Sequence, residues 1–305
     1  MSTPTAVRRT QTASHPIWIE KPSVGLRVAK AVTLGVIALV MLFPFVYVLS
    51  VSLSTQQDLT GSAVTLIPKH LTLEAYRQVL AGGVVGRALM VSVVITVVGT
   101  VVSMVMTTTL AYGFTRTRHV PGSRFVLLLV LGTLLFSAGI IPNYLLVRYL
   151  GLLNSYSALI VPGLISAFNL VVVRQFFMNI PDELTEAARI DGASPLQVFW
   201  HIILPLSKAV IAVVALFYGV AIWADFFNAL IYLSDTTKWP VQLVLRLFVL
   251  QGQNIASSQQ AGQPAPPAET VQMAVVIIAT VPIILVYPFL QKYFTQGVLS
   301  GAVKG

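Results

Sequence analysis

Six long runs of apolar residues alternate with polar segments along the chain. Each run is long enough for an α-helix to cross the hydrocarbon core of a bilayer, which takes roughly 20 residues. None of the runs has the two-residue alternation of a membrane β-strand. The pattern predicts an all-α integral membrane protein with six transmembrane helices. The expected spans are about 29–50, 88–114, 125–147, 156–177, 206–233 and 271–291.

Composition also indicates that most of the chain is surrounded by the lipid bilayer. Of the 305 residues, 56% are hydrophobic and 10% are charged, whereas soluble domains carry about 25% charged residues. The chain has no cysteine, and its four histidines are scattered outside the apolar runs, so we expect neither a disulfide nor a metal site. The net charge of +9 comes from basic residues dispersed through short loops. They form no dense patch, so we expect no nucleic-acid partner.

An even number of spans puts both termini on one side of the membrane, and the basic residues indicate which side. If the N-terminus is cytoplasmic, thirteen of the 19 Lys and Arg residues fall in inner segments and six in outer segments. Because short cytoplasmic loops are enriched in these residues, we expect a multi-pass protein with both termini in the cytoplasm. We expect three parts: a cytoplasmic tail at 1–28, a six-span domain at 29–294 and a cytoplasmic tail at 295–305. The six-span domain has two external loops, 51–87 and 234–270, and a cytoplasmic loop at 178–205.

Each expected external loop has one local feature. The first contains a possible surface helix from Leu73 to Leu80. The second contains a low-complexity stretch at 251–269, rich in Gln, Pro and Ala, whose composition cannot pack a core. This stretch is either a flexible linker or a loop that becomes ordered on an external partner.

The second apolar run carries small residues at three- and four-residue spacing. Small side chains at this spacing allow helices to approach closely and to form hydrogen bonds between them. We interpret this face as a helix-packing surface. Its members are Ser92, Thr96, Gly99, Ser103 and Thr107.

Asp225 is the only acidic residue inside an apolar run, and a carboxylate in lipid costs at least about 2.5–3.5 kcal/mol. Helical spacing places it on one face of an unbroken fifth helix with Tyr218, Ala221, Asn228 and Tyr232. This face is the wall of a path for a hydroxyl-rich solute or a hydrogen-bonded clasp between helices, or else Asp225 lies close enough to the outer surface to be hydrated. The candidate path residues are Asn143, Tyr144, Asn169, Tyr218, Trp223, Asp225 and Asn228.

The polar segment Pro181 to Pro205 holds four of the ten acidic residues. Pro181 is suited to the first turn of a helix, where the missing N–H has no cost, and the two acids that follow it favour the positive end of the helix dipole. Gly192 is suited to the left-handed residue that ends a helix. The segment therefore begins with a short, sharply bounded helix.

A second short helix is expected directly after the first. Ser194 can cap it and Pro195 can occupy its first turn, and Leu204-Pro205 should end it before the fifth span. Its apolar stripe comprises Leu196, Phe199, Trp200 and Ile203. On the cytoplasmic surface the second helix either lies on the membrane or packs on neighbouring spans. The first helix either docks in a groove of a soluble partner or is a simple connector between spans.

The same segment resembles a known motif. Glu186-Ala187-Ala188, then Gly192, then Leu204-Pro205 resembles the EAA coupling loop of ABC importer permeases. The resemblance implies a type I ABC importer permease fold with a cytoplasmic coupling helix that docks in a cleft of an ATPase. It assigns ATPase coupling to Glu186, Ala187, Ala188, Asp191, Gly192 and Pro205.

Other segments resemble one branch of this family. The stretches 136–144, 151–154 and 181–184 are similar to permeases of the carbohydrate-uptake group, and within it to the LplC/YtcP-like oligosaccharide permeases. The end of the chain, 291–305, is similar to the tail of the second maltose-type permease subunit, which reaches into the ATPase dimer. This similarity assigns ATPase contacts to Gly297, Ser300, Gly301 and Lys304.

The resemblance implies a transport subunit of the bacterial cytoplasmic membrane. Its expected partners are an ABC ATPase dimer at the cytoplasmic face, a second, homologous permease in a heterodimeric pair, and an extracellular solute-binding protein that delivers a carbohydrate. The chain contains no P-loop motif. We therefore expect no enzyme activity and no cofactor in this chain, with ATP and Mg bound by the partner ATPase.

Two other classes of function were weighed against the importer. An ion-coupled secondary transporter could use Asp225 as its ion or proton site, since such sites lie at broken helices near the membrane midplane. The sequence shows no internal repeat and no second buried acid to support it. A membrane enzyme would need a set of acid, base or nucleophile groups that the spans do not offer.

Overall fold

The computed structural model describes residues 24–60, 67–81, 83–115, 122–251 and 268–302. All regular structure in these ranges is helical, which confirms the predicted all-α class. The chain divides into two compact units, Met1–Tyr47 and Val48–Gly305. The expected tail at 1–28 lies almost wholly outside the described residues, as does the low-complexity stretch at 251–269.

The described part of the first unit is a single helix. Helix α1 (Val24–Ser52) begins in this unit and ends in the second. Its sequence is apolar over nearly its whole length, and Pro44 lies within it without ending it. The helix contains the expected first span.

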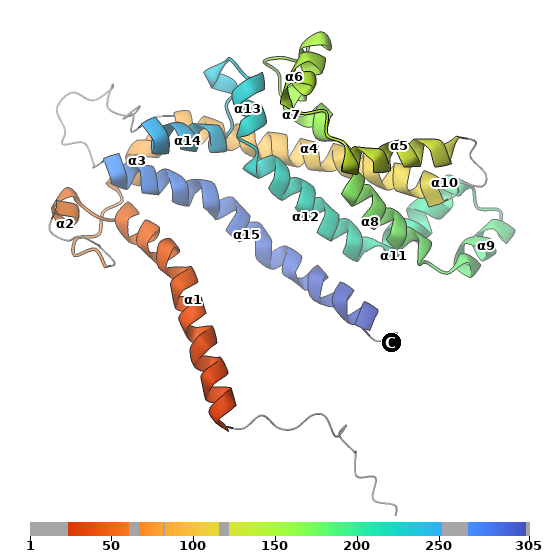
Figure 1. The fold of residues 1–305 in the computed structure, drawn as a ribbon, viewed down its shortest axis with the longest axis horizontal. Helices are drawn as coiled ribbons and strands as arrows, with labels where there is room; N and C mark the ends of the chain where they lie inside the picture. The colour runs from red at the N-terminus through yellow and green to blue at the C-terminus, as the bar shows by residue number, and fades with distance from the viewer. Residues whose placement is uncertain (1–23, 61–66, 82, 116–121, 252–267, 303–305) are drawn as a thin grey trace, which may run out of the picture. The chain divides into compact units, whose positions relative to one another are not determined.

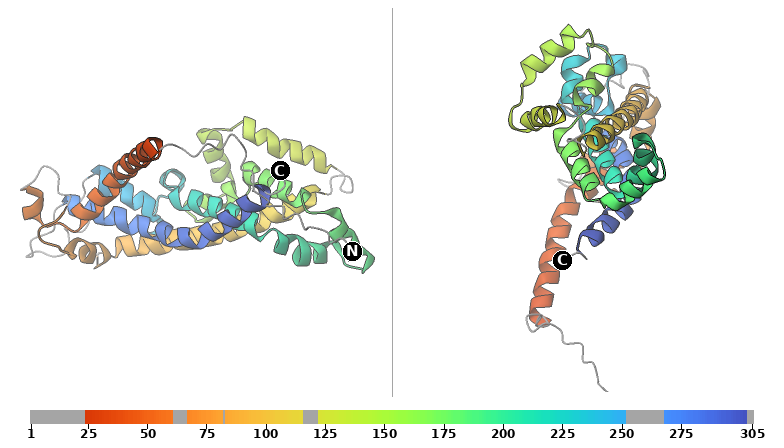
Figure 2. Two further views of the ribbon diagram at one scale, coloured as in Figure 1. Left: turned by 90° about the horizontal axis from the view of Figure 1, so that it is seen from below. Right: turned by 90° about the vertical axis from the view of Figure 1, so that its right-hand side faces the viewer.

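The second unit is organised around four helices that lie side by side. These are α4 (Val84–Thr115), α8 (Ala167–Met178), α12 (Lys208–Ala224) and α15 (Ala268–Ala302), and α12 contacts each of the other three. In Figure 1, α12 lies between α4 and α15, and the left view of Figure 2 shows these three helices running alongside one another. The small residues of α4 face this packing, as predicted: a Cβ placed on Gly99 would lie 2.9 Å from Ile222 of α12. Glycine at this position therefore lets the two helices approach closely.

Buried hydrogen bonds reinforce the packing of these helices. The hydroxyls of Thr107 on α4 and Tyr218 on α12 lie 2.7 Å apart. The indole of Trp223 on α12 donates to the carbonyl of Ala279 on α15 at 3.2 Å. Ser92 on α4 accepts from the backbone N–H of Val241 at 2.8 Å. Polar groups that would be costly in lipid are thereby satisfied between helices.

One end of the second unit is built from short helices. Helices α2 (Gln56–Thr60), α3 (Glu74–Ala81) and α14 (Val241–Gln251) gather there with the start of α15. Helix α3 is the predicted surface helix, displaced by one residue. Apolar side chains of α3, α4, α14 and α15 form one core cluster with Trp223 of α12.

Asp58 forms hydrogen bonds with residues on both sides of it in the segment that precedes α3. Its side chain is 3% exposed, and its carboxylate accepts from the backbone N–H of His70 at 3.1 Å and from the hydroxyl of Thr55 at 3.1 Å. Its other oxygen lies 3.2 Å from Nδ1 of His70. Burial raises the pKa of Asp58, but the hydrogen bonds from His70 and Thr55 outweigh it and hold the pKa below its ordinary value.

Three of the expected spans are broken. The third divides at Phe136–Gly139 into α5 (Ser123–Leu135) and α6 (Ile140–Tyr149). The fourth comprises α7 (Ser157–Ile160), η1 (Val161–Gly163) and α8, which are bent by 51°. The fifth ends at Ala224 and resumes as α13 (Phe227–Tyr232), followed by η3 (Thr236–Lys238). The prediction of an unbroken fifth helix was therefore wrong.

Three helices are long and apolar enough to cross a membrane within the described residues: Val24–Ser52, Val84–Thr115 and Ala268–Val286. Two bent pairs, Ser157–Gly163 with Ala167–Met178 and Pro195–Leu206 with Lys208–Ala224, would raise the number to five. The divided third span passes this test in neither of its parts, so the count of six stays a prediction.

Candidate functional site

The polar segment Pro181 to Pro205 forms the two predicted short helices. The first is α9 (Asp182–Ile190), with two acids in its first turn and none of its residues buried. Pro181 is the residue before the helix, with φ −55°, and not its first helical residue as predicted. Helix α9 thus presents an acidic, exposed surface at one end of the second unit (Figure 1).

Helix α9 ends in a Schellman motif centred on Gly192. The backbone N–H of Ala193 donates to the carbonyl of Ala188 at 2.9 Å, and the N–H of Gly192 donates to that of Arg189 at 3.0 Å. Gly192 has φ +84°, a left-handed conformation that costs any residue with a Cβ roughly 1–2 kcal/mol. The predicted role of Gly192 as a helix stop is confirmed.

The second helix begins with a capping box. The hydroxyl of Ser194 accepts from the N–H of Gln197 at 3.4 Å, and the amide oxygen of Gln197 accepts from the N–H of Ser194 at 2.7 Å. Helix α10 (Pro195–Val198) then continues into a π-helical turn, η2 (Phe199–Ile203), and α11 (Leu204–Leu206). The predicted start of this helix is confirmed.

The π-helical turn is anchored in the main core of the second unit. Phe199 is 6% exposed and Ile203 3% exposed, and they pack in one cluster with side chains of α4, α8 and α12. The rings of Phe199 and Tyr112 lie 5.0 Å apart, and the hydroxyl of Tyr112 donates to the carbonyl of Pro195 at 2.9 Å. This segment is therefore packed directly against the long helices.

The apolar stripe of the second helix is divided between the core and the surface. Phe199 and Ile203 are buried against the core, whereas Leu196 is 68% and Trp200 59% exposed. Val198, which the pattern left out, is fully buried. The turn at η2 is wider than an α-helical turn, so it changes which residues face the core.

A sharp bend joins this segment to α12. The helices Pro195–Leu206 and Lys208–Ala224 meet at 82°, and Ser207 at the junction is fully buried. Its N–H is shared between the carbonyls of Ile203 and Leu204. The break was expected at Leu204-Pro205 and occurs at Ser207, because Pro205 fits the first turn of α11.

Five of the six residues assigned to ATPase coupling lie on α9 or directly after it, and the sixth, Pro205, lies in α11. Glu186, Ala187, Asp191 and Gly192 are exposed, and Ala188 is half-buried against the core. Pro205 is exposed in α11. Among the tail residues assigned to ATPase contact, Gly297, Ser300 and Gly301 lie on α15, and Lys304 lies outside the described residues.

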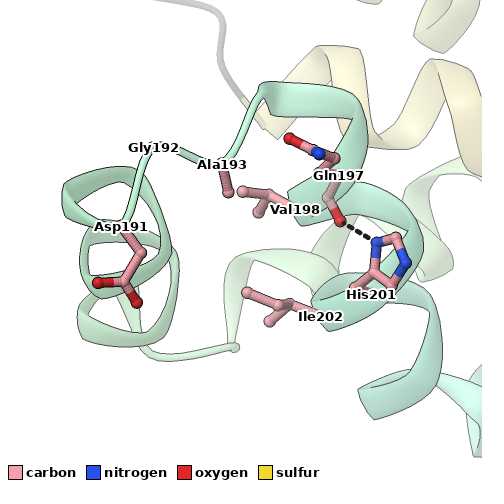
Figure 3. Close-up of a pocket in the computed structure, with 7 residues that line it drawn as sticks. All are labelled: Asp191, Gly192, Ala193, Gln197, Val198, His201 and Ile202. Atoms are coloured by element: carbon pink, nitrogen blue, oxygen red, sulfur yellow. Dashed lines mark hydrogen bonds between the residues drawn. The ribbon is translucent and has the colours of Figure 1, made fainter.

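A cavity of about 300 Å³ separates α9 from the second helix (Figure 3). Its lining comprises Asp191, Gly192, Ala193, Gln197, Val198, His201 and Ile202. Sequence reasoning had not singled out Gln197 or His201. The Ser-x-x-Gln spacing of a capping box could have identified Gln197.

The carboxylate of Asp225 bonds to the first turn of the helix that follows the break in the fifth span. Its carboxylate accepts from the backbone N–H of Asn228 at 3.1 Å and from the side-chain amide of Asn228 at 2.7 Å. The carboxylate is half-buried beside Ser92 and Pro240. The carboxylate of Asp225 thus finds its hydrogen-bond partners three residues away in the chain.

The other candidate path residues are spread over the second unit. Tyr218 and Trp223 are buried and form the interhelical hydrogen bonds described above. Asn169 is buried at the start of α8. Tyr144 stacks on Tyr232 with 6.3 Å between ring centroids, and Asn143 is exposed on α6. Their role in a solute path stays a prediction.

Comparison with known proteins gives consistent matches over most of the chain. Residues 124–300 match a family described as "Binding-protein-dependent transport system inner membrane component". Protein LplC of Bacillus subtilis (strain 168) is 47% identical over 273 residues, which cover 89% of this chain and 92% of LplC. The polygalacturonan/rhamnogalacturonan transport system permease protein YtcP of the same organism is 44% identical over 271 residues, which cover 88% of this chain and 94% of YtcP.

A solved structure shares the fold. It is the crystal structure of a bacterial ABC transporter involved in the import of the acidic polysaccharide alginate. The TM-score is 0.82 at 30% sequence identity, and the match covers 92% of this chain and 100% of the other. Helix arrangement and sequence therefore point to the same group of proteins.

Proposed function

The chain belongs to the family of binding-protein-dependent transport system inner membrane components, and we propose that it is one of two homologous permeases in an ATP-driven importer of oligosaccharides. Membership makes it an ABC importer permease subunit with a type I fold. Permease subunits of this family are not themselves enzymes. In our proposal, ATP and Mg are bound and ATP is hydrolysed by a partner ABC ATPase dimer at the cytoplasmic face.

The observation that carries this proposal is the contrast between α9 and the turn that follows it. No residue of α9 is buried, whereas Phe199 and Ile203 are buried among α4, α8 and α12. A partner that binds α9 would therefore act on an element firmly attached to the long helices. This is the mechanical requirement for a coupling helix.

We propose that the chain contributes alternating access. Closure of the ATPase dimer on ATP would displace α9, and the buried turn at η2 would pass the displacement to α4, α8 and α12. The spans would then change from an inward-facing to an outward-facing arrangement, as packed elements with two stable arrangements do. Hydrolysis and release would reset them. Both termini and α9 lie in the cytoplasm in this proposal.

The substrate class rests on relatives and on the polar groups of the broken spans. YtcP is named for polygalacturonan and rhamnogalacturonan, and the matching structure is that of an alginate importer. An extracellular solute-binding protein would deliver a carbohydrate of this kind to a path along the third to sixth spans. Asn143, Asp225 and Asn228 are partly or fully accessible and offer groups that hydrogen-bond sugar hydroxyls.

The coupling role is tested in the complete transporter in lipid nanodiscs. In Glu186→Ala we expect carbohydrate-stimulated ATPase activity to fall at least about tenfold, because the exposed acid of α9 is lost from the interface. Glu74→Ala is the matched control, since Glu74 is also exposed and helical but lies on α3. Carbohydrate-stimulated ATPase activity that is unchanged in Glu186→Ala would contradict the coupling role.

A second measurement separates the importer from the ion-coupled alternative. Proteoliposomes with the complete transporter should take up the carbohydrate only with ATP, the ATPase and the binding protein. Uptake that follows an ion gradient without the ATPase, and that Asp225→Asn abolishes, would instead support a secondary transporter. The carboxylate of Asp225 already accepts two hydrogen bonds from Asn228. This favours the ATP-driven importer over a transporter that binds an ion or proton at Asp225.

A further inference from the structure

Arg246 on α14 carries a charge without a partner in the described part of the chain. Of the arginines that the structure describes, two are half-buried, Arg174 and Arg246. Arg174 donates from Nε to the carbonyl of Phe114 at 3.1 Å, whereas Arg246 forms neither a hydrogen bond nor an ion pair with any described residue. A partly desolvated cation without a counter-ion is unfavourable. A bound anion would therefore stabilise this position.

Packing determines where this guanidinium lies. Leu243, three residues earlier on α14, is fully buried in a cluster with Ala229 and Leu233 of α13 and its end, and Figure 1 shows the two helices next to each other. Residues three apart share a helix face, so Arg246 also lies on the side of α14 that faces α13. Its Cζ is 4.5 Å from the centre of the Phe226 ring, in the break between α12 and α13.

Contact with the ring leaves the N–H groups of Arg246 available. The attraction between a cation and an aromatic ring acts over the face of the ring. The five N–H donors of an arginine form a fixed fork that matches the two oxygens of a carboxylate. None of these donors has an acceptor within the described ranges. The ring of Phe226 thus positions the fork, and the fork can receive a carboxylate.

The surroundings of Phe226 suit a sugar that carries this carboxylate. The ring of Phe227 lies edge-on to that of Phe226 with 6.2 Å between centroids, and Phe227 is 40% exposed. The amide oxygen of Asn228 has no partner among the residues described, so it can accept from a hydroxyl. Both carboxylate oxygens of Asp225 accept from Asn228 and do not pair with Arg246. Aromatic side chains with a few polar groups are typical of small-molecule sites.

We propose that Arg246 binds a carboxylate of the transported oligosaccharide, so that the imported solute contains uronic acid residues. This role rests on the importer function proposed above and narrows its substrate class. The fork of Arg246 pairs with the uronate carboxylate, while Phe227 and Asn228 contact the ring and hydroxyls of the sugar. In the predicted topology Arg246 belongs to the external loop 234–270, on the side from which the solute enters.

Uptake into proteoliposomes by the complete transporter tests this role. The probes are trigalacturonate and trimannuronate, each compared with its neutral methyl ester and delivered by the same binding protein. For Arg246→Gln we expect uptake of the acidic sugar to fall about tenfold relative to uptake of its ester, a loss typical of a hydrogen bond to a charged group. Every variant receives solute from the same binding protein, so the preference of that protein cancels from the comparison.

Two matched variants separate carboxylate recognition from general effects. Arg246→Lys keeps the charge without the fork, and its acid-to-ester ratio should fall only about threefold. Arg77→Gln removes an exposed charge on α3 and should leave the ratio unchanged. An equal loss of acid and ester uptake in Arg246→Gln would indicate a structural role and overturn the proposal. A ratio that is unchanged in Arg246→Gln, or that falls equally in Arg77→Gln, would also overturn it.

The same assay distinguishes the remaining outcomes. Arg246→Gln could raise the concentration of binding protein needed for half-maximal uptake equally for acid and ester. That result would assign Arg246 to docking of the binding protein and overturn the proposal. Uptake of neutral oligosaccharides but of neither acid by the unmodified transporter would overturn it as well. Absence of ATP-dependent uptake of any carbohydrate would instead overturn the proposed function.

Discussion

The hydroxyl of Tyr218 connects three helices of the second unit. Tyr218 on α12 is 4% exposed. Its hydroxyl accepts from the N–H of Ser166, the cap of α8, at 2.9 Å and lies 2.7 Å from the hydroxyl of Thr107 on α4. Either hydroxyl can be the donor in the contact between Tyr218 and Thr107. Replacement by phenylalanine keeps the ring and removes only these two bonds.

The expected loss is about 1–2 kcal/mol of unfolding free energy. Each hydrogen bond contributes a net 0.5–1.5 kcal/mol in general and about 0.6 kcal/mol between membrane helices. Thr107 can turn its hydroxyl to a carbonyl of its own helix, as Thr108 does with that of Met104 at 2.7 Å. The N–H of Ser166 has no such alternative, so most of the loss should come from this group.

Equilibrium unfolding of the purified permease pair measures this loss. A double-mutant cycle with Thr107→Val should give a coupling energy of at least about 0.5 kcal/mol, above the usual deviation from additivity. Tyr149→Phe is the control, because Tyr149 is 88% exposed, and it should leave stability unchanged. Additive effects of Tyr218→Phe and Thr107→Val, or a loss no larger than that of Tyr149→Phe, would refute the reasoning.

Three further predictions concern single groups. Gly192→Ala should lower stability by about 1–2 kcal/mol through its positive φ alone, since a Cβ there meets nothing within 4 Å. Gly192→Asn, which tolerates this conformation, should cost less in the same unfolding measurement. Ser194→Ala should cost about 0.5–2 kcal/mol and speed hydrogen exchange at the N–H of Gln197; unchanged exchange would contradict the capping box. The folded pKa of Asp58 lies below its ordinary value of about 3.9, so its contribution is present above that pH and lost as pH falls through the folded pKa. Hydrogen exchange at His70 should reveal this loss, and Asp58→Asn should remove the pH dependence.

The sequence predicted the local structure of the segment from Pro181 to Pro205 well because its signals are local. Acids in the first turn, a glycine at the left-handed stop and a serine before proline each act within a few residues. The structure places α9, Gly192 and Ser194 accordingly. The start of α9 differs by one residue because Pro181 takes an extended ψ of 131°.

The break in the fifth span could not be predicted because it depends on a group that competes with the helix. The apolar pattern continues through Asp225, but α12 ends at Ala224 and the carboxylate of Asp225 accepts from the N–H of Asn228 in the first turn of α13. The expected single helix face from Tyr218 to Tyr232 therefore does not exist. The hydrogen bonds that Asp225 forms with Asn228 are local and differ from the expected clasp between helices.

The π-helical turn at η2 has a tertiary origin. An α-helical register predicts that Trp200 faces the core, but Trp200 is 59% exposed while Val198 is fully buried. The contact of Phe199 with Tyr112 of α4 and the bond from Tyr112 to Pro195 fix this register. These partners are more than eighty residues apart in sequence, so the local pattern holds no information about them.

The central claim is that α9 is the surface on which the ATPase docks. The chain contains no cysteine, so Ala187→Cys introduces the only thiol, at an exposed position on α9. With a benzophenone maleimide on this thiol in the complete transporter, the account predicts photo-crosslinking to the ATPase, with a yield that changes when ATP is bound. The same label at Thr236→Cys on η3 should not crosslink to the ATPase. Crosslinking from Thr236→Cys but not from Ala187→Cys would contradict the account.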